Sequence, residues 1–148
     1  MTALLAVPFY VGETFVFKVK FGFISAGELT LQVVSRESLR GEEVWRFRLR
    51  AKGGVPFYRI DDLIEAWARV SDLASLRYYK RLREGSYRAE RKIDYYSDEG
   101  FAVYSEGDTV PSPPGAVDPL TVVYYARTLP LEPGALFRVP YHVDRRSD

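Results

Sequence analysis

In the stretch from Val44 to Lys52, apolar and basic side chains alternate strictly from Trp45 onwards, and this pattern restricts the fold more than any other feature. One set of alternate positions is apolar and the other is basic: Trp45, Phe47, Leu49 and Ala51 against Arg46, Arg48, Arg50 and Lys52. Successive side chains of a β-strand point to opposite faces of the sheet. This period of two therefore predicts a strand with one buried face and one solvated, strongly basic face.

The same alternation recurs along much of the chain. It predicts strands at Glu13 to Phe21, Ala26 to Val34, Phe57 to Val70, Leu76 to Arg83, Ser86 to Tyr96, Phe101 to Ser105 and Ala135 to Val143. Turn-forming residues separate these strands, including a turn at Arg40-Gly41 and a break at Gly53-Gly54. A helix is the alternative for Asp61 to Val70, but a strand fits the surrounding run of hairpins better.

The first hairpin has a preferred register. Phe17 should lie beside Leu29 on the apolar face, because a two-residue loop would set Phe17 against Glu28. This register requires either a three-residue turn, Gly22 to Ile24, or a bulge near Gly27.

A later hairpin turns around Glu84-Gly85. A loop of these two residues places Lys80 opposite Ala89, whereas a loop at Gly85-Ser86 would place Lys80 opposite Arg91. Like charges directly opposite each other are destabilising. We therefore expect the first register.

One helix is predicted, at Asp118 to Arg127. Asp118 can cap its first turn, and Pro119 fits the first helical position, where no amide hydrogen is needed. A helix this short is marginal in water unless it packs on another surface. We therefore expect a mainly β fold, a curled antiparallel sheet or partly open β-barrel of about seven or eight strands wrapped around this helix.

The length of 148 residues suits one domain, and we expect a single domain over residues 1–148. The net charge of +1 does not call for a nucleic acid partner, and the lack of cysteine excludes disulfides. The apolar start, Ala3 to Val7, is too short for a membrane span and is not a complete secretory signal. The chain stops at Asp148 directly after a predicted strand, so truncation at one or both ends is an alternative.

Catalytic groups are few. The single histidine, His142, lies near the end of the chain, and no serine stands in a nucleophile-elbow pattern. The glycines from Gly22 to Gly27 have the spacing of a phosphate loop, but Glu28 stands where lysine is required. We expect no catalytic residue, no metal and no cofactor.

The densest carboxylates near apolar residues are Asp61, Asp62 and Glu65, which could bind a hard metal ion or act as an acid and base. On a strand Asp61 and Glu65 share a face while Asp62 points the other way, so only two of them converge. Pairing with neighbouring arginines on a solvated face is the interpretation we favour. A carboxylate or metal-dependent enzyme is kept as an alternative function.

Two cations fall on the apolar side of their strands. Most basic residues between Arg77 and Lys92 lie on the polar side, but Lys80 and Arg91 share a side with Leu82 and Ile93. A buried charge is costly unless it is paired, and an anionic ligand head could pair both. The alternatives are that Asp62 neutralises one of them or that both extend to the rim.

Three stretches, in this order, carry a resemblance to a known family: Gly12-Glu13 with the Gly22 and Ala26-Gly27 turn, Ile60-Asp61-Asp62 followed by Leu76 to Arg91, and Asp118-Pro119-Leu120 to Tyr124-Tyr125-Ala126-Arg127. Together they resemble an uncharacterised bacterial envelope family known as domain of unknown function 3108. The resemblance implies a location in the periplasm or cell envelope. It also implies an architecture similar to that of lipoprotein-localisation carriers, whose concave sheet shelters acyl chains.

The combined expectation is a non-enzymatic envelope protein that holds an amphipathic or acyl-bearing ligand, or a partner's hydrophobic segment, in the concave face. The predicted ligand-binding residues are Phe17, Leu31, Trp45, Phe47 and Tyr124 for apolar contact, with Lys80 and Arg91 for an anionic head. The alternative is a structural or assembly protein with a solid core, which recruits an envelope partner through a sheet edge. No nucleic acid is expected, and any membrane contact is peripheral.

Overall fold

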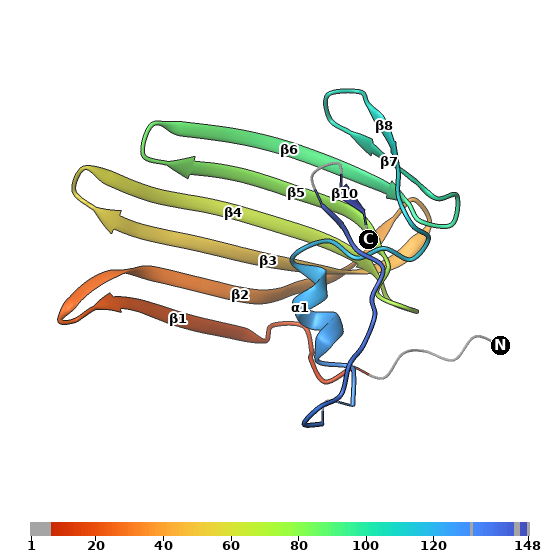
Figure 1. Ribbon diagram of the computed structural model, residues 1–148, viewed down its shortest axis with the longest axis horizontal. Coiled ribbons are helices and arrows are strands. Elements are labelled where there is room, and N and C mark those ends of the chain that lie inside the picture. Colours follow the sequence, from red (N-terminus) through yellow and green to blue (C-terminus); the bar gives the residue numbers. More distant parts are fainter. Residues whose placement is uncertain (1–6, 131, 144–145, 148) are drawn as a thin grey trace.

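The computed structural model describes residues 7–130, 132–143 and 146–147, and it shows an antiparallel sheet of eight strands with one short helix (Figure 1). The strands of this sheet lie side by side in chain order. They are β1 (Thr14–Phe21), β2 (Ile24–Leu39), β3 (Glu42–Val55), β4 (Tyr58–Arg69), β5 (Ser75–Glu84), β6 (Tyr87–Tyr96), β7 (Phe101–Tyr104) and β8 (Thr109–Pro111). The helix is α1 (Thr121–Ala126), and β9 (His142–Val143) pairs with β10 (Arg146–Ser147) in a separate small sheet. The predicted antiparallel β fold with one short helix is confirmed.

The large sheet is open. β1 and β8 form its two edges, and within the described ranges neither edge pairs with a further strand. It therefore neither closes into a barrel nor curls around the helix. The strands also shorten towards one edge, where β8 has only three residues and ends at Pro111, which has no amide hydrogen to donate.

Helix α1 covers only part of one face of the sheet, away from the tips of the β1–β2, β3–β4 and β5–β6 hairpins (Figure 1). We call this face the helix-facing side and the opposite one the outer face. The buried carboxylate of Asp118 attaches the helix to the sheet. It accepts hydrogen bonds from the backbone N–H groups of Leu120 and Thr121, at 2.8 and 2.7 Å, and from the Ser75 hydroxyl of β5 at 2.6 Å. Asp118 therefore bonds the first turn as predicted, but the helix begins at Thr121 and not at Pro119, and Leu120 occupies its N-cap position.

The core lies between α1 and the sheet. The ring of Tyr124 on α1 stacks on Phe47 of β3, with centroids 4.0 Å apart, and Phe9 packs edge-on against both rings. Cross-strand neighbours extend this core across six strands. This core row consists of Val33, Phe47, Ala66, Tyr78, Ile93 and Tyr104, all buried.

The first hairpin has the predicted pairing of Phe17 with Leu29, but its turn differs. Phe21 pairs with Ile24, so the loop is Gly22-Phe23 and the three-residue turn is wrong. The register shifts between Val19 and Lys20, which is the alternative of a bulge near Gly27.

The predicted register of the β5–β6 hairpin is wrong. Glu84 pairs with Tyr87, the loop is Gly85-Ser86, and Lys80 lies directly opposite Arg91. The turn explains the difference, because Gly85 has a φ of +62° at the first loop position. Two-residue hairpin turns with glycine at this position match the twist of the strands. This preference outweighed the repulsion between Lys80 and Arg91.

Two further boundaries differ from prediction. β3 continues through Gly53-Gly54 to Val55, so the glycines do not break the strand. The predicted last strand over Ala135 to Val143 is reduced to β9 and a single bridge between Val117 and Tyr141. Pro140 lies beside that bridge and lacks the amide hydrogen that a longer ladder needs.

Candidate functional site

A second cross-strand row on the helix-facing side changes from apolar to cationic. This boundary row lies next to the core row on the side of the hairpin tips, and it consists of Phe15, Leu31, Leu49, Ile64, Lys80 and Arg91. Its four apolar residues come from β1 to β4, and its two cations come from β5 and β6. The row therefore places an apolar surface directly beside two positive charges.

An open hollow lies between the boundary row and the hairpin tips. This distal hollow has a volume of about 380 Å³. The side chains around it are apolar and come from β1 to β4, principally Val19, Phe21, Leu29, Ala51, Val55, Tyr58 and Ile60. A volume of this size lies within the range of roughly 300–1,000 Å³ found for small-molecule sites.

Glycines form the floor of the distal hollow. Gly27 of β2 pairs with Gly53 of β3, and Gly54 follows with a φ of +103°. A Cβ atom on Gly53 would collide with the carbonyl oxygen of Ala26, and one on Gly54 would collide with that of Tyr58. Because these positions carry no side chains, the strands approach closely and the space above them stays open.

A smaller hollow of about 190 Å³ lies where α1 meets β1 and β2. Phe17, Leu31 and Tyr124 line it together with Arg127. The Arg127 guanidinium pairs with Glu13 through two hydrogen bonds of 2.5 and 3.0 Å, which ties α1 to the start of β1. The buried Tyr124 hydroxyl has no hydrogen-bond partner within the described part of the chain. Burial and the charge of Glu13 raise the pKa of Tyr124 to about 12, so it stays a neutral hydrogen-bond donor.

The two cations of the boundary row have defined surroundings. Arg91 donates to Glu106 at 3.0 Å and its guanidinium lies 5.3 Å from the centre of the Tyr104 ring. Both Lys80 and Arg91 are half-buried. Asp62 accepts a hydrogen bond from the backbone N–H of Arg83 at 3.0 Å and shares another with the carboxyl group of Glu84.

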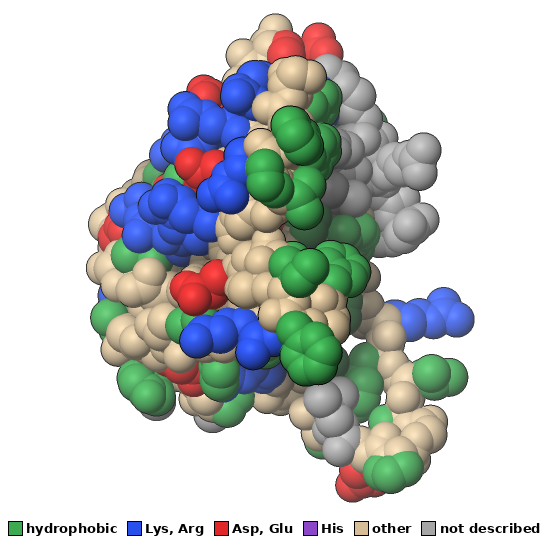
Figure 2. Space-filling model, turned by 90° about the vertical axis from the view of Figure 1, so that its left-hand side faces the viewer, with side chains coloured by type: hydrophobic (Ala, Val, Ile, Leu, Met, Phe, Trp, Pro, Cys, Tyr) green, Lys and Arg blue, Asp and Glu red, His purple; other side chains and the backbone are tan. Residues whose placement is uncertain are grey.

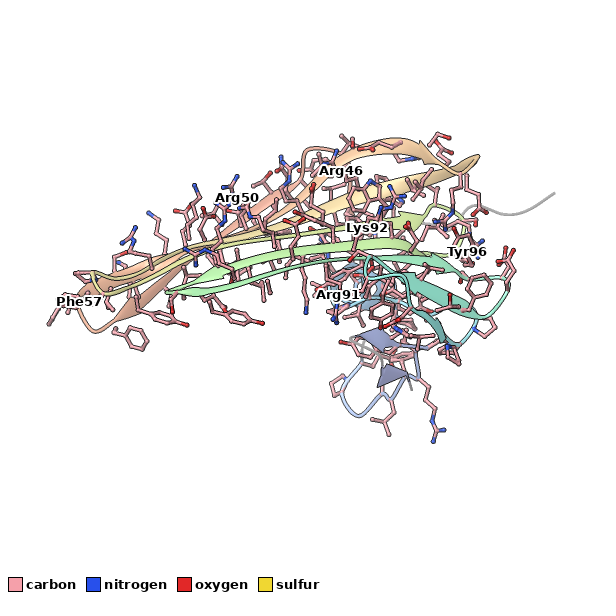
Figure 3. The ribbon with its side chains drawn as sticks, turned by 90° about the horizontal axis from the view of Figure 1, so that it is seen from above. Arg46, Arg50, Phe57, Arg91, Lys92 and Tyr96 are labelled. Carbon is pink, nitrogen blue, oxygen red and sulfur yellow. The ribbon has the colours of Figure 1, made fainter. Side chains whose placement is uncertain are left out.

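The outer face carries the basic stripe, and Figure 3 shows Arg46 and Arg50 on that face while Arg91 extends from the helix-facing side. Glu65 bonds Arg46 at 2.9 Å and Arg48 at 3.0 Å. Asp61 lies 3.7 Å from Arg50 and 3.6 Å from Arg81. These carboxylates are therefore paired with arginines as predicted, but Glu65 is buried and does not lie on a solvated surface. In the described part of the chain, no cluster of three or more His, Cys, Asp or Glu residues has the geometry to hold a metal ion.

The structure distributes the predicted ligand-binding residues over two environments. Trp45, Phe47 and Tyr124 are buried in the core at 6%, 0% and 1% exposure, so they support the site from beneath. Phe17 is half exposed and Leu31 is partly buried, and both reach the surface of the helix-facing side. Lys80 and Arg91 lie together as cross-strand neighbours.

Sequence reasoning missed the lining of the distal hollow. Phe21, Val55 and Tyr58 lie in or next to hairpin tips, where apolar residues have no core to pack against. The run Gly53-Gly54-Val55-Pro56-Phe57 was the available signal, because an apolar hairpin tip is unusual unless it contacts something.

These features define an open antiparallel β-sheet protein with one helix among its described residues and a partly uncovered apolar face. Within the described residues no helix has both the length and the apolar character needed to cross a membrane. The chain belongs to a family described as a protein of unknown function (DUF3108), whose family model matches residues 16–148. No curated protein and no solved structure matches the chain.

Proposed function

We propose that this protein binds an amphipathic ligand, with an acyl-like apolar part and an anionic head, on the helix-facing side of its sheet. The observation that carries the proposal is the boundary row, which passes from four apolar residues to Lys80 and Arg91 beside an open hollow. The apolar part would lie over the distal hollow and the head would approach the two cations.

Two physical arguments support this ligand class. Apolar surface that remains in water costs about 25 cal/mol per Å², so covering the hollow with an acyl chain is favourable. Lys80 and Arg91 stand directly opposite each other, so an anionic head placed near both would interact with two positive charges at once. The head of the ligand would then compete with Glu106 for Arg91.

The proposal assigns the protein a binding role without catalysis, in the bacterial cell envelope. The pairing of Asp61 and Glu65 with arginines supports the absence of a catalytic carboxylate site, because both carboxylates already have partners on the outer face. The envelope location rests on the family resemblance alone. Fractionation of cells that express the natural gene tests the envelope location.

Native mass spectrometry of the purified chain, before and after mild organic extraction, tests the binding role. A co-purifying lipid-like mass that disappears on extraction is the expected result. The Ala51→Phe variant fills the floor of the distal hollow and should lose this mass. Thr30→Phe adds the same side chain to β2 on the outer face and should keep it. Apoprotein alone in every sample, or an equal loss in both variants, would contradict the proposal.

A second candidate function is recruitment of another chain through the edge strand β1. All eight residues of β1 are exposed, and β1 pairs only with β2 among the described strands. An exposed strand of this length offers a row of unpaired backbone groups to a partner strand. Val16→Pro removes an amide hydrogen from this edge and should abolish association measured by light scattering. Association that survives the substitution would exclude β1 as the contact.

A further inference from the structure

The tips of three hairpins gather at one end of the sheet (Figure 1). Exposed aromatic residues lie in or next to each of these tips. Phe23 in the β1–β2 loop and Phe57 in the β3–β4 loop are 107% and 99% exposed. Around them lie further exposed apolar side chains, namely Phe21, Ile24, Val55, Tyr58 and Tyr87. Fully exposed phenylalanines contribute nothing to the core. Their presence at one end of the sheet therefore indicates a contact with an external partner.

The three tips form one connected surface. Gly27 and Gly53 pair across β2 and β3, which holds the first tip beside the second. The N–H of Gly85 donates to the carbonyl oxygen of Arg59 at 2.7 Å, which joins the second tip to the third. The sheet therefore holds the three tips, with their aromatic residues, next to one another.

Positive charge surrounds these rings. Residues 20–26, 52–59 and 83–88 contain five cations (Lys20, Lys52, Arg59, Arg83 and Arg88) and one carboxylate (Glu84), a net charge of +4 against +1 for the whole chain. Figure 2 looks at this end of the molecule and shows hydrophobic side chains bordered on the outer face by many Lys and Arg side chains, with a few Asp and Glu among them. The combination of protruding aromatic rings and adjacent cations is complementary to an anionic lipid surface.

We infer that this end of the sheet docks on an anionic bilayer, with Phe23 and Phe57 inserted into the interface and the five cations meeting lipid phosphates. A protein partner fits less well, because Phe23 and Phe57 are almost fully exposed and line neither of the two hollows. The inference goes beyond ligand binding, but the two are compatible in space. Phe21, Val55 and Tyr58 belong to the tips and also line the distal hollow, so docking places that hollow against the lipid.

Flotation with vesicles tests the inference without any knowledge of the ligand. The probes are vesicles of phosphatidylcholine alone and vesicles containing a fraction of phosphatidylglycerol. The expected result is flotation with the anionic vesicles, weakened by added salt because screening reduces the attraction of the cations. Equal flotation with both vesicles, or none with either, would overturn the inference.

A double variant isolates the aromatic tips. Phe23→Ser with Phe57→Ser should lower the vesicle partition coefficient on the order of tenfold or more, since each ring loses most of its favourable transfer. Leu136→Ser is the matched control, because Leu136 is 95% exposed but lies outside the tips. Equal loss in both would show that the tips have no special role.

Insertion itself has a separate readout. Brominated acyl chains in the anionic vesicles should quench the fluorescence of a tryptophan introduced by Phe57→Trp. They should not quench that of a tryptophan introduced by Leu136→Trp. Quenching at neither position would overturn insertion. It would also be overturned if the natural protein bound no vesicles and instead formed a dimer that the serine variant does not form. The Ala51→Phe variant should still bind vesicles, so failure of the ligand proposal and failure of docking are distinguishable.

Discussion

Gly27 on β2 and Gly53 on β3 lie directly opposite each other, in a contact that no other residue type could make. A Cβ atom on Gly27 would lie 2.5 Å from the carbonyl oxygen of Lys52, and one on Gly53 would collide with that of Ala26. Their φ angles of +154° and +153° are also rare for residues with a side chain. The pair keeps the floor of the distal hollow bare.

Gly53→Ala should lower the free energy of unfolding by about 2–4 kcal/mol, because it adds backbone strain to a collision with a carbonyl oxygen. Gly107→Ala is the control: Gly107 has a φ of +101°, but a Cβ atom there would have no other atom within 4 Å. It should cost only about 1 kcal/mol. Urea denaturation of both variants measures the difference, and equal costs would show that the contact with Ala26 relaxes freely.

Asp118→Asn should destabilise the protein by about 2–4 kcal/mol, since an amide nitrogen cannot accept the hydrogen bonds that both carboxylate oxygens accept. Ser75 and Thr121 would each lose a hydrogen-bond acceptor in a fully buried position. Asp98→Asn removes an exposed carboxylate that pairs with Arg69 and should cost less than about 1 kcal/mol. Thermal unfolding compares the two, and similar losses would rule out a special role for the Asp118 network.

The fold was largely predictable because its signals are local. The period of two in Val44 to Lys52 specifies which side of β3 is buried, whatever the rest of the chain does. Asp118 followed by proline likewise marks the start of a helix from neighbouring residues alone. The pairing of Phe17 with Leu29 also followed, because a one-residue slip would have turned Phe15, Phe17 and Val19 to the outer face.

The site was less predictable because it depends on comparisons between competing weak effects. Repulsion between Lys80 and Arg91 disfavours the observed register of the β5–β6 hairpin, whereas a turn with glycine at its first loop position favours it. The preference of the turn at Gly85 was the stronger effect. The distal hollow is open because α1 covers only part of the sheet. The alternation of residues along the strands does not show how far the helix extends over them. Trp45 and Phe47 were expected at the ligand surface but are buried, Phe47 under Tyr124 of the helix and Trp45 against Phe9.

Glu84 provides a prediction about pH. Partial burial and then the neighbouring Asp62 carboxyl raise the pKa of Glu84 above its ordinary value of 4.5. The folded state therefore binds this proton more strongly than the unfolded state does. The resulting stabilisation is complete below the ordinary value and is lost as the pH rises through the folded-state pKa. Glu84→Gln stays neutral, so its stability relative to the natural protein should increase with pH across this window.

Urea denaturation at several pH values between about 4 and 7 measures this trend. The Asp62→Asn background is the control, because it removes the carboxyl group that interacts with Glu84. In that background the advantage of Glu84→Gln should shrink, as expected for two residues in one hydrogen-bonded pair. A trend of unchanged size would show that burial alone shifts the pKa of Glu84.

Lys80 and Arg91 provide the test of the anionic head. If both contact it, Lys80→Ala and Arg91→Ala should each weaken the binding of dodecanoate about tenfold, because a charge-assisted hydrogen bond is lost. Binding of dodecanol, which has the same chain and no charge, should hardly change. Lys92→Ala removes a cation from the same hairpin on the outer face and should alter neither affinity. Isothermal titration calorimetry measures all four proteins. Equal weakening for the acid and the alcohol would mean that the two cations only shape the site, and unchanged dodecanoate affinity would remove them from it.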